Sequence, residues 1–130
     1  MSQFFDNHSI YAPFLLRIFL AFHLIKGVLD NILSWERMIE FAEFLKIHHF
    51  PIPLVSAVLS VSIQFISAVL VLIGFKTRWV SAVLMIHFLI AILMVHIGDS
   101  YQNVFPALVM VAFSLFLLLN GAGKPAVDRN

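Results

Sequence analysis

The sequence contains no cysteine and few charged residues. Without cysteine, the chain has no thiol–disulfide chemistry, no Cys-ligated iron–sulfur cluster and no zinc–thiolate site of its own. Charged residues make up only 12% of the 130 positions, too few to solvate the surface of a water-soluble domain of this size. The formal net charge of +1, without a run of basic residues, also argues against a nucleic-acid partner.

The short motifs of common enzyme sites are also missing. There is no GxSxG nucleophile elbow, no phosphate-binding loop and no dinucleotide fingerprint, and no carboxylate pair lies inside an apolar stretch. No HxxxH or ExxH pair occurs in such a stretch either, so we expect no metal site. These absences argue against autonomous hydrolytic or nucleotide chemistry and leave any catalytic residue unknown.

Long apolar stretches are what the sequence has in abundance. Hydrophobic residues make up 62% of it, and residues 47–75, 79–98 and 100–123 carry no formal charge. An α-helix rises 1.5 Å per residue, so about 20 apolar residues cross a hydrocarbon core roughly 30 Å thick. We therefore expect an all-α membrane protein, a four-transmembrane-helix bundle forming a single membrane domain over residues 1–130. The predicted spans are residues 11–33, 54–74, 79–97 and 104–120.

The first predicted span carries two charges, Arg17 and Lys26. We expect Arg17 to snorkel towards one interface and Lys26 towards the other, which keeps both charges away from the midplane. No basic region and no small-residue cleavage site precedes this apolar run, so we expect no removable signal peptide.

Residues 35–47 predict a further helix that lies in the membrane interface. Ser34 is the expected N-cap, and Glu36 lies in the first turn. Helical spacing places an apolar stripe on one side and carboxylates on the other, a pattern typical of an interfacial helix. The stripe consists of Trp35, Met38, Ile39, Ala42 and Leu45, and the other side carries Glu36, Glu40 and Glu43.

The distribution of lysine and arginine predicts the orientation of the chain. With both termini on one side, that side collects five basic residues: Arg17, Lys76, Arg78, Lys124 and Arg129. The positive-inside rule then places both termini in the cytoplasm, and we expect the protein in the bacterial inner membrane.

The second span carries small and polar residues along one helical face. Ser56, Ser60, Gln64, Ser67 and Gly74 are spaced by four, four, three and seven positions, so they share a face that must contact protein or water rather than lipid. Gln64 lies at the middle of this span. It is either a hydrogen-bonding group for a ligand or an interhelical contact, and such stripes favour the interhelical contact.

Polar residues in the other spans complete the candidate set. His23, Lys26 and Asp30 share a face of the first span, where Lys26 either has a buried functional role or snorkels beside Asp30, with which it can pair. His87 and His96 are nine positions apart, so they point in opposite directions. By depth, His23, Gln64 and His87 form a central layer, and Lys26 and His96 an outer one.

These residues define two predicted groups. The candidate ligand-binding residues are His23, Lys26, Gln64, His87 and His96. The polar residues expected to have structural roles are Arg17, Asp30, Ser60, Ser67, Thr77 and Arg78.

Several short motifs follow one another along nearly the whole chain. They are Leu15-Leu16-Arg17, His23 three positions before Lys26, Phe50-Pro51-Ile52-Pro53, Gly74-Phe75-Lys76-Thr77-Arg78, His96, and Gly121-Ala122-Gly123-Lys124 followed by Asp128. In this order they resemble the motifs of the DoxX family of small four-helix membrane proteins. The resemblance implies a four-helix bundle and a link to membrane oxidoreductase systems, including thiosulfate–quinone oxidoreductase subunits. The family pattern has a glutamate where this chain has Gln64, and an amide cannot carry protons by titrating.

Three functions remain open at this stage. The resemblance favours a membrane subunit or partner of a redox-linked system whose bundle binds a quinone or a lipid-like ligand. The lack of catalytic motifs favours a non-catalytic membrane scaffold or assembly factor that uses the acidic side of residues 35–47. A small transporter is the third alternative. The cofactor is unknown, with quinone as the candidate, and the expected partners are the lipid bilayer, a redox enzyme or a second copy of the chain.

Overall fold

The computed structural model describes residues 2–95 and 97–128, which are helical along most of their length and contain no strand. Four of the helices are long and apolar enough to cross a membrane, so the prediction of an all-α protein with four such helices is confirmed. The elements are α1 (Ser2–His8), the short 3-10 helix η1 (Ser9–Tyr11), α2 (Ala12–Leu33), α3 (Trp35–Ile47), α4 (Pro53–Ile73), α5 (Thr77–Val95) and α6 (Tyr101–Asn120).

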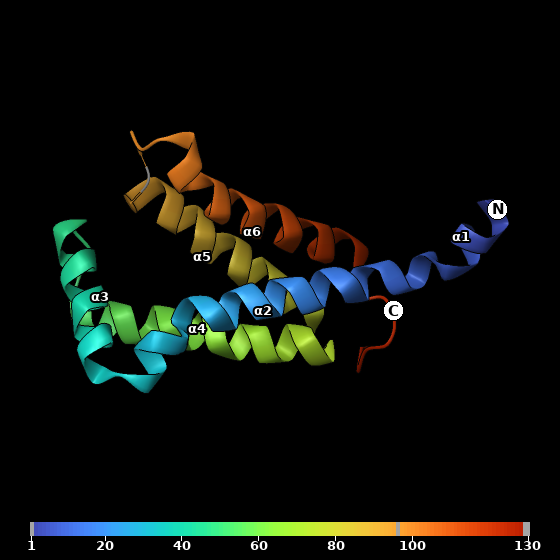
Figure 1. The fold of residues 1–130 in the computed structure, drawn as a ribbon, viewed down its shortest axis with the longest axis horizontal. Coiled ribbons are helices and arrows are strands. Elements are labelled where there is room, and N and C mark those ends of the chain that lie inside the picture. Colours follow the sequence, from blue (N-terminus) through green and yellow to red (C-terminus); the bar gives the residue numbers. More distant parts are fainter. Residues whose placement is uncertain (1, 96, 129–130) are drawn as a thin grey trace.

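The long helices form two antiparallel pairs. α2 packs mainly against α4, and α5 mainly against α6, with fewer contacts between the pairs. Figure 1 shows the pairs close together near the C-terminus and diverging towards the end that carries α3. The two ends of the bundle therefore differ. We call the end near the C-terminus the closed end and the other the α3 end.

The buried core is divided between these two ends. The larger cluster combines side chains from all four long helices: Leu20, Ala21, Leu24, Ala68, Val71, Val80, Leu84, Met110 and Leu117. A smaller cluster joins α3 to α2 and α4 and consists of Val28, Met38, Ala42, Leu45, Ala57 and Val61. Only part of the stripe predicted for α3 packs inwards, because Trp35 and Ile39 are exposed.

Most of the apolar surface of the long helices faces outwards. No more than 33% of any of the four candidate spans is buried inside the protein. Trp79, Leu93 and Leu119 are examples, with exposed fractions of 77%, 65% and 72%. Water would solvate such a surface poorly, whereas acyl chains match it. The chain is therefore an integral membrane protein.

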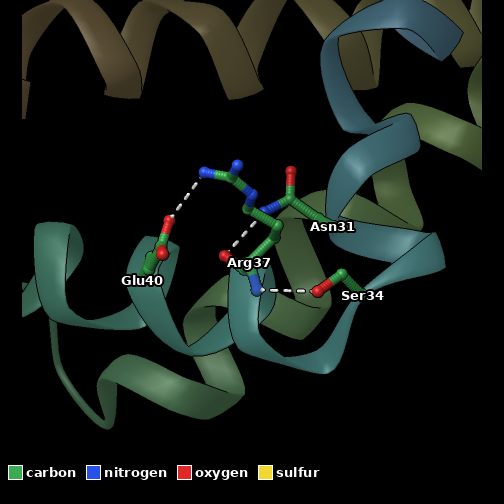
Figure 2. Close-up of polar contacts among 4 residues, drawn as sticks. All are labelled: Asn31, Ser34, Arg37 and Glu40. Atoms are coloured by element: carbon green, nitrogen blue, oxygen red, sulfur yellow. Dashed lines mark hydrogen bonds and ion pairs between the residues drawn. The ribbon is translucent and has the colours of Figure 1, made fainter.

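The turn between α2 and α3 is fixed by short-range polar contacts (Figure 2). Ser34 has an extended backbone, and its side chain accepts a hydrogen bond from the Arg37 backbone N–H at 3.4 Å, which confirms the predicted N-cap. Asn31 Nδ2 donates to the Arg37 carbonyl at 3.1 Å, and Arg37 Nη1 lies 3.1 Å from Glu40 Oε2. Of these contacts, the Asn31 bond links α2 to α3, while the other two lie at the start of α3 itself.

Candidate functional site

A cavity of about 600 Å³ lies between α3, α4 and α5, towards the α3 end of the bundle. Its wall is mostly aromatic and aliphatic: Phe41 and Phe44 from α3, Phe50 from the following loop, Ile63 from α4, and Ile86 and Phe88 from α5. A cavity of this size and composition fits the apolar body of a small molecule.

Three linked polar side chains line the same cavity. Gln64 Nε2 donates to Ser60 Oγ at 3.2 Å, and Ser60 Oγ lies 2.8 Å from His87 Nε2. The Ser60 hydroxyl can donate to an unprotonated Nε2 or accept from a protonated one, so both neutral imidazole tautomers satisfy this bond. His87 Nδ1 is buried and has no hydrogen-bond partner among the described residues. A ligand with one polar end would find donors and acceptors at this point.

The predicted ligand-binding residues do not all meet. Gln64 and His87, from the central layer, both line the cavity. His23 lies on an exposed side of α2, with its ring 4.2 Å from that of Phe19, and does not line the cavity. Lys26 does not line it either and is also exposed. His96 lies outside the described residues. Equal depth therefore does not bring these residues together, because depth does not fix the direction of a side chain.

The ion pair that the spacing of Lys26 and Asp30 permits is not formed. Both residues are exposed, and among the described residues the ion pair is Arg37–Glu40, in α3. A four-residue spacing permits a pair on a helix, but exposed side chains gain little from adopting the required rotamers.

The polar face of α4 has different surroundings along its length. In its first half, Ser60 and Gln64 line the cavity between α3, α4 and α5. Its second half is buried, because Ser67 is 6% exposed and Gly74 has no free space around it. The stripe is therefore an interhelical contact near the closed end and part of a cavity wall near the α3 end.

A second polar cluster lies at the closed end around Arg17. The prediction that Arg17 snorkels to the interface is wrong, because its side chain is 0% exposed. The guanidinium donates four hydrogen bonds to backbone carbonyls, those of Val71 at 2.8 Å, Leu72 at 2.7 Å, Ala122 at 3.1 Å and Pro125 at 2.6 Å. These carbonyls belong to the last turn of α4 and to the segment after α6.

Asp128 completes this cluster at the start of α5. Its carboxylate accepts the backbone N–H groups of Lys76 at 2.6 Å and Thr77 at 2.7 Å. Burial raises the pKa of Asp128, but hydrogen bonds from Thr77 and Lys76 and the charge of Arg17 outweigh that effect and leave the pKa below its ordinary value. Only the ordered family motifs single out Asp128 in the sequence, since its partners are backbone groups more than 50 positions away.

Arg78, the second residue of α5, has a weaker contact. It is exposed, and its Nη2 donates to the Asn120 carbonyl at 3.3 Å. The residues that the structure describes include no group of three or more His, Cys, Asp or Glu side chains placed to hold a metal ion.

Comparison with known proteins identifies a family. The family model described as DoxX matches residues 12–97, which run from the start of α2 to the turn after α5 and cover more than half of the chain. A search of curated proteins and a search of solved structures each found no significant match.

Proposed function

Because the chain belongs to the DoxX family, we propose that it is a membrane subunit or partner of a quinone-linked redox system, and that its cavity binds the quinone. The observation that carries this proposal is the apolar cavity between α3, α4 and α5, with the linked side chains of Ser60, Gln64 and His87 in its wall.

The chemistry of the cavity supports a ligand with an apolar body and a polar end. A quinone carbonyl accepts a hydrogen bond, and the hydroxyl of the reduced form donates one. His87 and Ser60 can meet both needs by exchanging the imidazole tautomer. The buried Nδ1 of His87 lacks a partner, and leaving such an atom unpaired costs on the order of 1–3 kcal/mol. A bound carbonyl or hydroxyl would recover part of that free energy. Electrons would come from a partner protein or a bound cofactor.

The placement in the membrane is part of the same proposal. Lys76, Arg78 and Lys124 are exposed at the closed end, which the positive-inside rule assigns to the cytoplasm of a bacterial inner membrane. α3 lies in the opposite interface, with Met38, Ala42 and Leu45 packed inwards. The whole chain then acts as one membrane domain, with the cavity towards the outer side.

Quinone binding by matched histidine variants tests this function. Protein purified gently should retain quinone in its lipid extract. His87→Gln should weaken the binding of added quinone about tenfold, the effect expected for a lost hydrogen bond of about 1.4 kcal/mol. His23→Gln is the control, because it makes the same change at a similar depth but outside the cavity.

Two outcomes would contradict the assignment. One is the absence of quinone from the lipid extract together with no response to added quinone. The other is that His87→Gln and His23→Gln weaken quinone binding equally, which would mean that quinone does not bind in this cavity.

A second function, that of a non-catalytic scaffold or assembly factor, is favoured by the surface of α3. Glu36, Glu40 and Glu43 are all exposed there and present carboxylates to a basic partner. Replacing all three by Gln should then abolish co-purification of the partner while leaving quinone retention unchanged. Loss of function in Lys26→Ala with intact partner co-purification would count against the scaffold.

A further inference from the structure

Three motifs that are far apart in the sequence meet at the closed end. Arg17 from α2 bonds the end of α4, and residues 121–128, here called the C-terminal segment, return to both. The Val127 N–H donates to the Ile73 carbonyl at 3.0 Å, and the Asp128 N–H to the Gly74 carbonyl at 2.8 Å. Together with the Asp128 carboxylate on α5, these bonds tie the C-terminal segment to α2, α4 and α5 at once. We call this arrangement the lock.

The C-terminal segment packs closely against the helices at two glycines, while its residues 123–128 also line a cavity of about 1150 Å³ together with residues 9–13, Phe116 and Asn120. A Cβ added at Gly74 would overlap the Ala126 side chain and come 2.8 Å from Arg17 Nη2. At Gly123, an added Cβ would overlap the Ile10 carbonyl and come 2.9 Å from Pro13 Cγ. The Lys124 N–H also donates to the Ile10 carbonyl at 3.0 Å. The segment is therefore held near both of its ends by backbone hydrogen bonds, and it contacts the helices closely at Gly74 and Gly123.

A closely packed core separates the lock from the cavity between α3, α4 and α5. On α4 the cavity wall ends at Gln64 and on α5 it begins at Val83, so no residue of the lock lines it. The intervening layer includes Ala68, Val71 and Leu84, each 0% exposed. In contrast, the helix pairs diverge beside the cavity (Figure 1).

From these observations we propose that the cavity is reached only from the α3 end or sideways from the lipid, and that the lock keeps the opposite end closed. The proposal concerns access and does not depend on the identity of the ligand. It also bears on transport, because alternating access would require the four Arg17 bonds and the two carboxylate bonds of Asp128 to break in every cycle.

Substituted-cysteine labelling tests the proposal cleanly, since the chain has no cysteine of its own. Ser60→Cys reports on the cavity, and Ser81→Cys reports on the core of the closed end, where Ser81 is 0% exposed. Glu43→Cys and Lys124→Cys, both at exposed positions, identify which side of a sealed vesicle carries each end. A membrane-impermeant maleimide is applied to right-side-out and to inside-out vesicles, and a bilayer-soluble maleimide to both.

The expected result is one-sided labelling. Ser60→Cys should react from the Glu43 side, or with the bilayer-soluble reagent, at least about tenfold faster than from the Lys124 side, because a buried thiol reacts only when its surroundings open. Equal or faster reaction from the Lys124 side would overturn the proposal. A Ser60→Cys thiol that reacts with neither reagent would also overturn it, because the cavity would then be closed to both routes.

The role of the lock is tested by adding a second substitution to Ser81→Cys. Asp128→Asn or Arg17→Gln should raise its labelling from the Lys124 side about tenfold, while Arg78→Gln should leave it unchanged. Asp128→Asn keeps Arg17 in place and so covers the case in which Arg17→Gln fails to fold. Unchanged labelling of Ser81→Cys in folded Asp128→Asn protein would show that the lock does not close this end.

Discussion

Arg17 shows how a guanidinium is accommodated inside an apolar bundle. A buried charge without partners would be strongly unfavourable, and here no acidic side chain forms an ion pair with it among the described residues. Its partners are backbone carbonyls, two of them in the last turn of α4, where carbonyls lack helical partners and carry the negative end of the helix dipole. Arg17 therefore acts as a cap for α4 from a different helix.

This role predicts a large effect of Arg17→Gln on stability. A glutamine side chain cannot reach four carbonyls, so several charge-assisted hydrogen bonds are lost, and the free energy of unfolding should fall by about 3–5 kcal/mol. Titration with SDS from mild micelles measures the change. Arg78→Gln is the matched control, because Arg78 is exposed and makes one bond of 3.3 Å, and it should cost less than about 1 kcal/mol. Equal losses in the two variants would contradict the capping role.

At the scale of elements, the short turn between α4 and α5 requires glycine. Gly74 follows the last residue of α4 with a φ of +74°, the left-handed conformation in which helices commonly end. The C-terminal segment then packs where a side chain would project from this residue. Gly74 is therefore required for two independent reasons, its left-handed backbone conformation and the close packing of the C-terminal segment.

Two glycine-to-alanine substitutions should therefore have opposite effects. Gly74→Ala adds left-handed strain of roughly 1–2 kcal/mol and an overlap with Ala126, and it should destabilise the protein by more than the strain alone. Gly27→Ala lies inside α2 with nothing within 4 Å of the added Cβ, so it should be neutral or stabilise by up to about 1 kcal/mol. Thermal unfolding of the pair in one detergent measures both, and a Gly74→Ala protein as stable as Gly27→Ala would refute the packing argument.

At the scale of the whole molecule, the sequence predicts the helices much better than their contacts. The spans predicted at 54–74 and 79–97 are found at Pro53–Ile73 and Thr77–Val95, because charged residues, prolines and glycines bound the apolar stretches. α1 was not predicted, since no strong periodic pattern marks it.

The candidate site was only partly predictable for a physical reason. Helical spacing identified the face that holds Ser60 and Gln64, and depth placed His87 beside them. Neither spacing nor depth determines which helices become neighbours, so His23 was grouped with residues that it does not approach. The burial of Arg17 could not be predicted, because its partners lie 54 to 108 positions away in the sequence. These partners are backbone carbonyls, which every residue has, so no residue type in the sequence indicates them.

Asp128 joins the last part of the described chain to the start of α5, so its ionisation should affect the stability of the whole bundle. Its folded-state pKa lies below the ordinary aspartate value of about 3.9. Its contribution is therefore complete above about pH 5 and is lost as the pH falls through the folded-state pKa, below about pH 4. Asp128→Asn should accordingly be less stable than the parent protein at neutral pH, and the difference should shrink as the pH falls below about 4.

Unfolding midpoints measured between pH 3 and pH 7 test this expectation. Asp30→Asn is the control, because Asp30 is exposed on α2 and forms no ion pair with Lys26. A stability difference for Asp128→Asn that stays constant from pH 7 to pH 3 would mean that the negative charge of the carboxylate does not strengthen its bonds to Lys76 and Thr77. The C-terminal segment would then be held by its packing, its backbone hydrogen bonds and the Arg17 hydrogen bonds to Ala122 and Pro125.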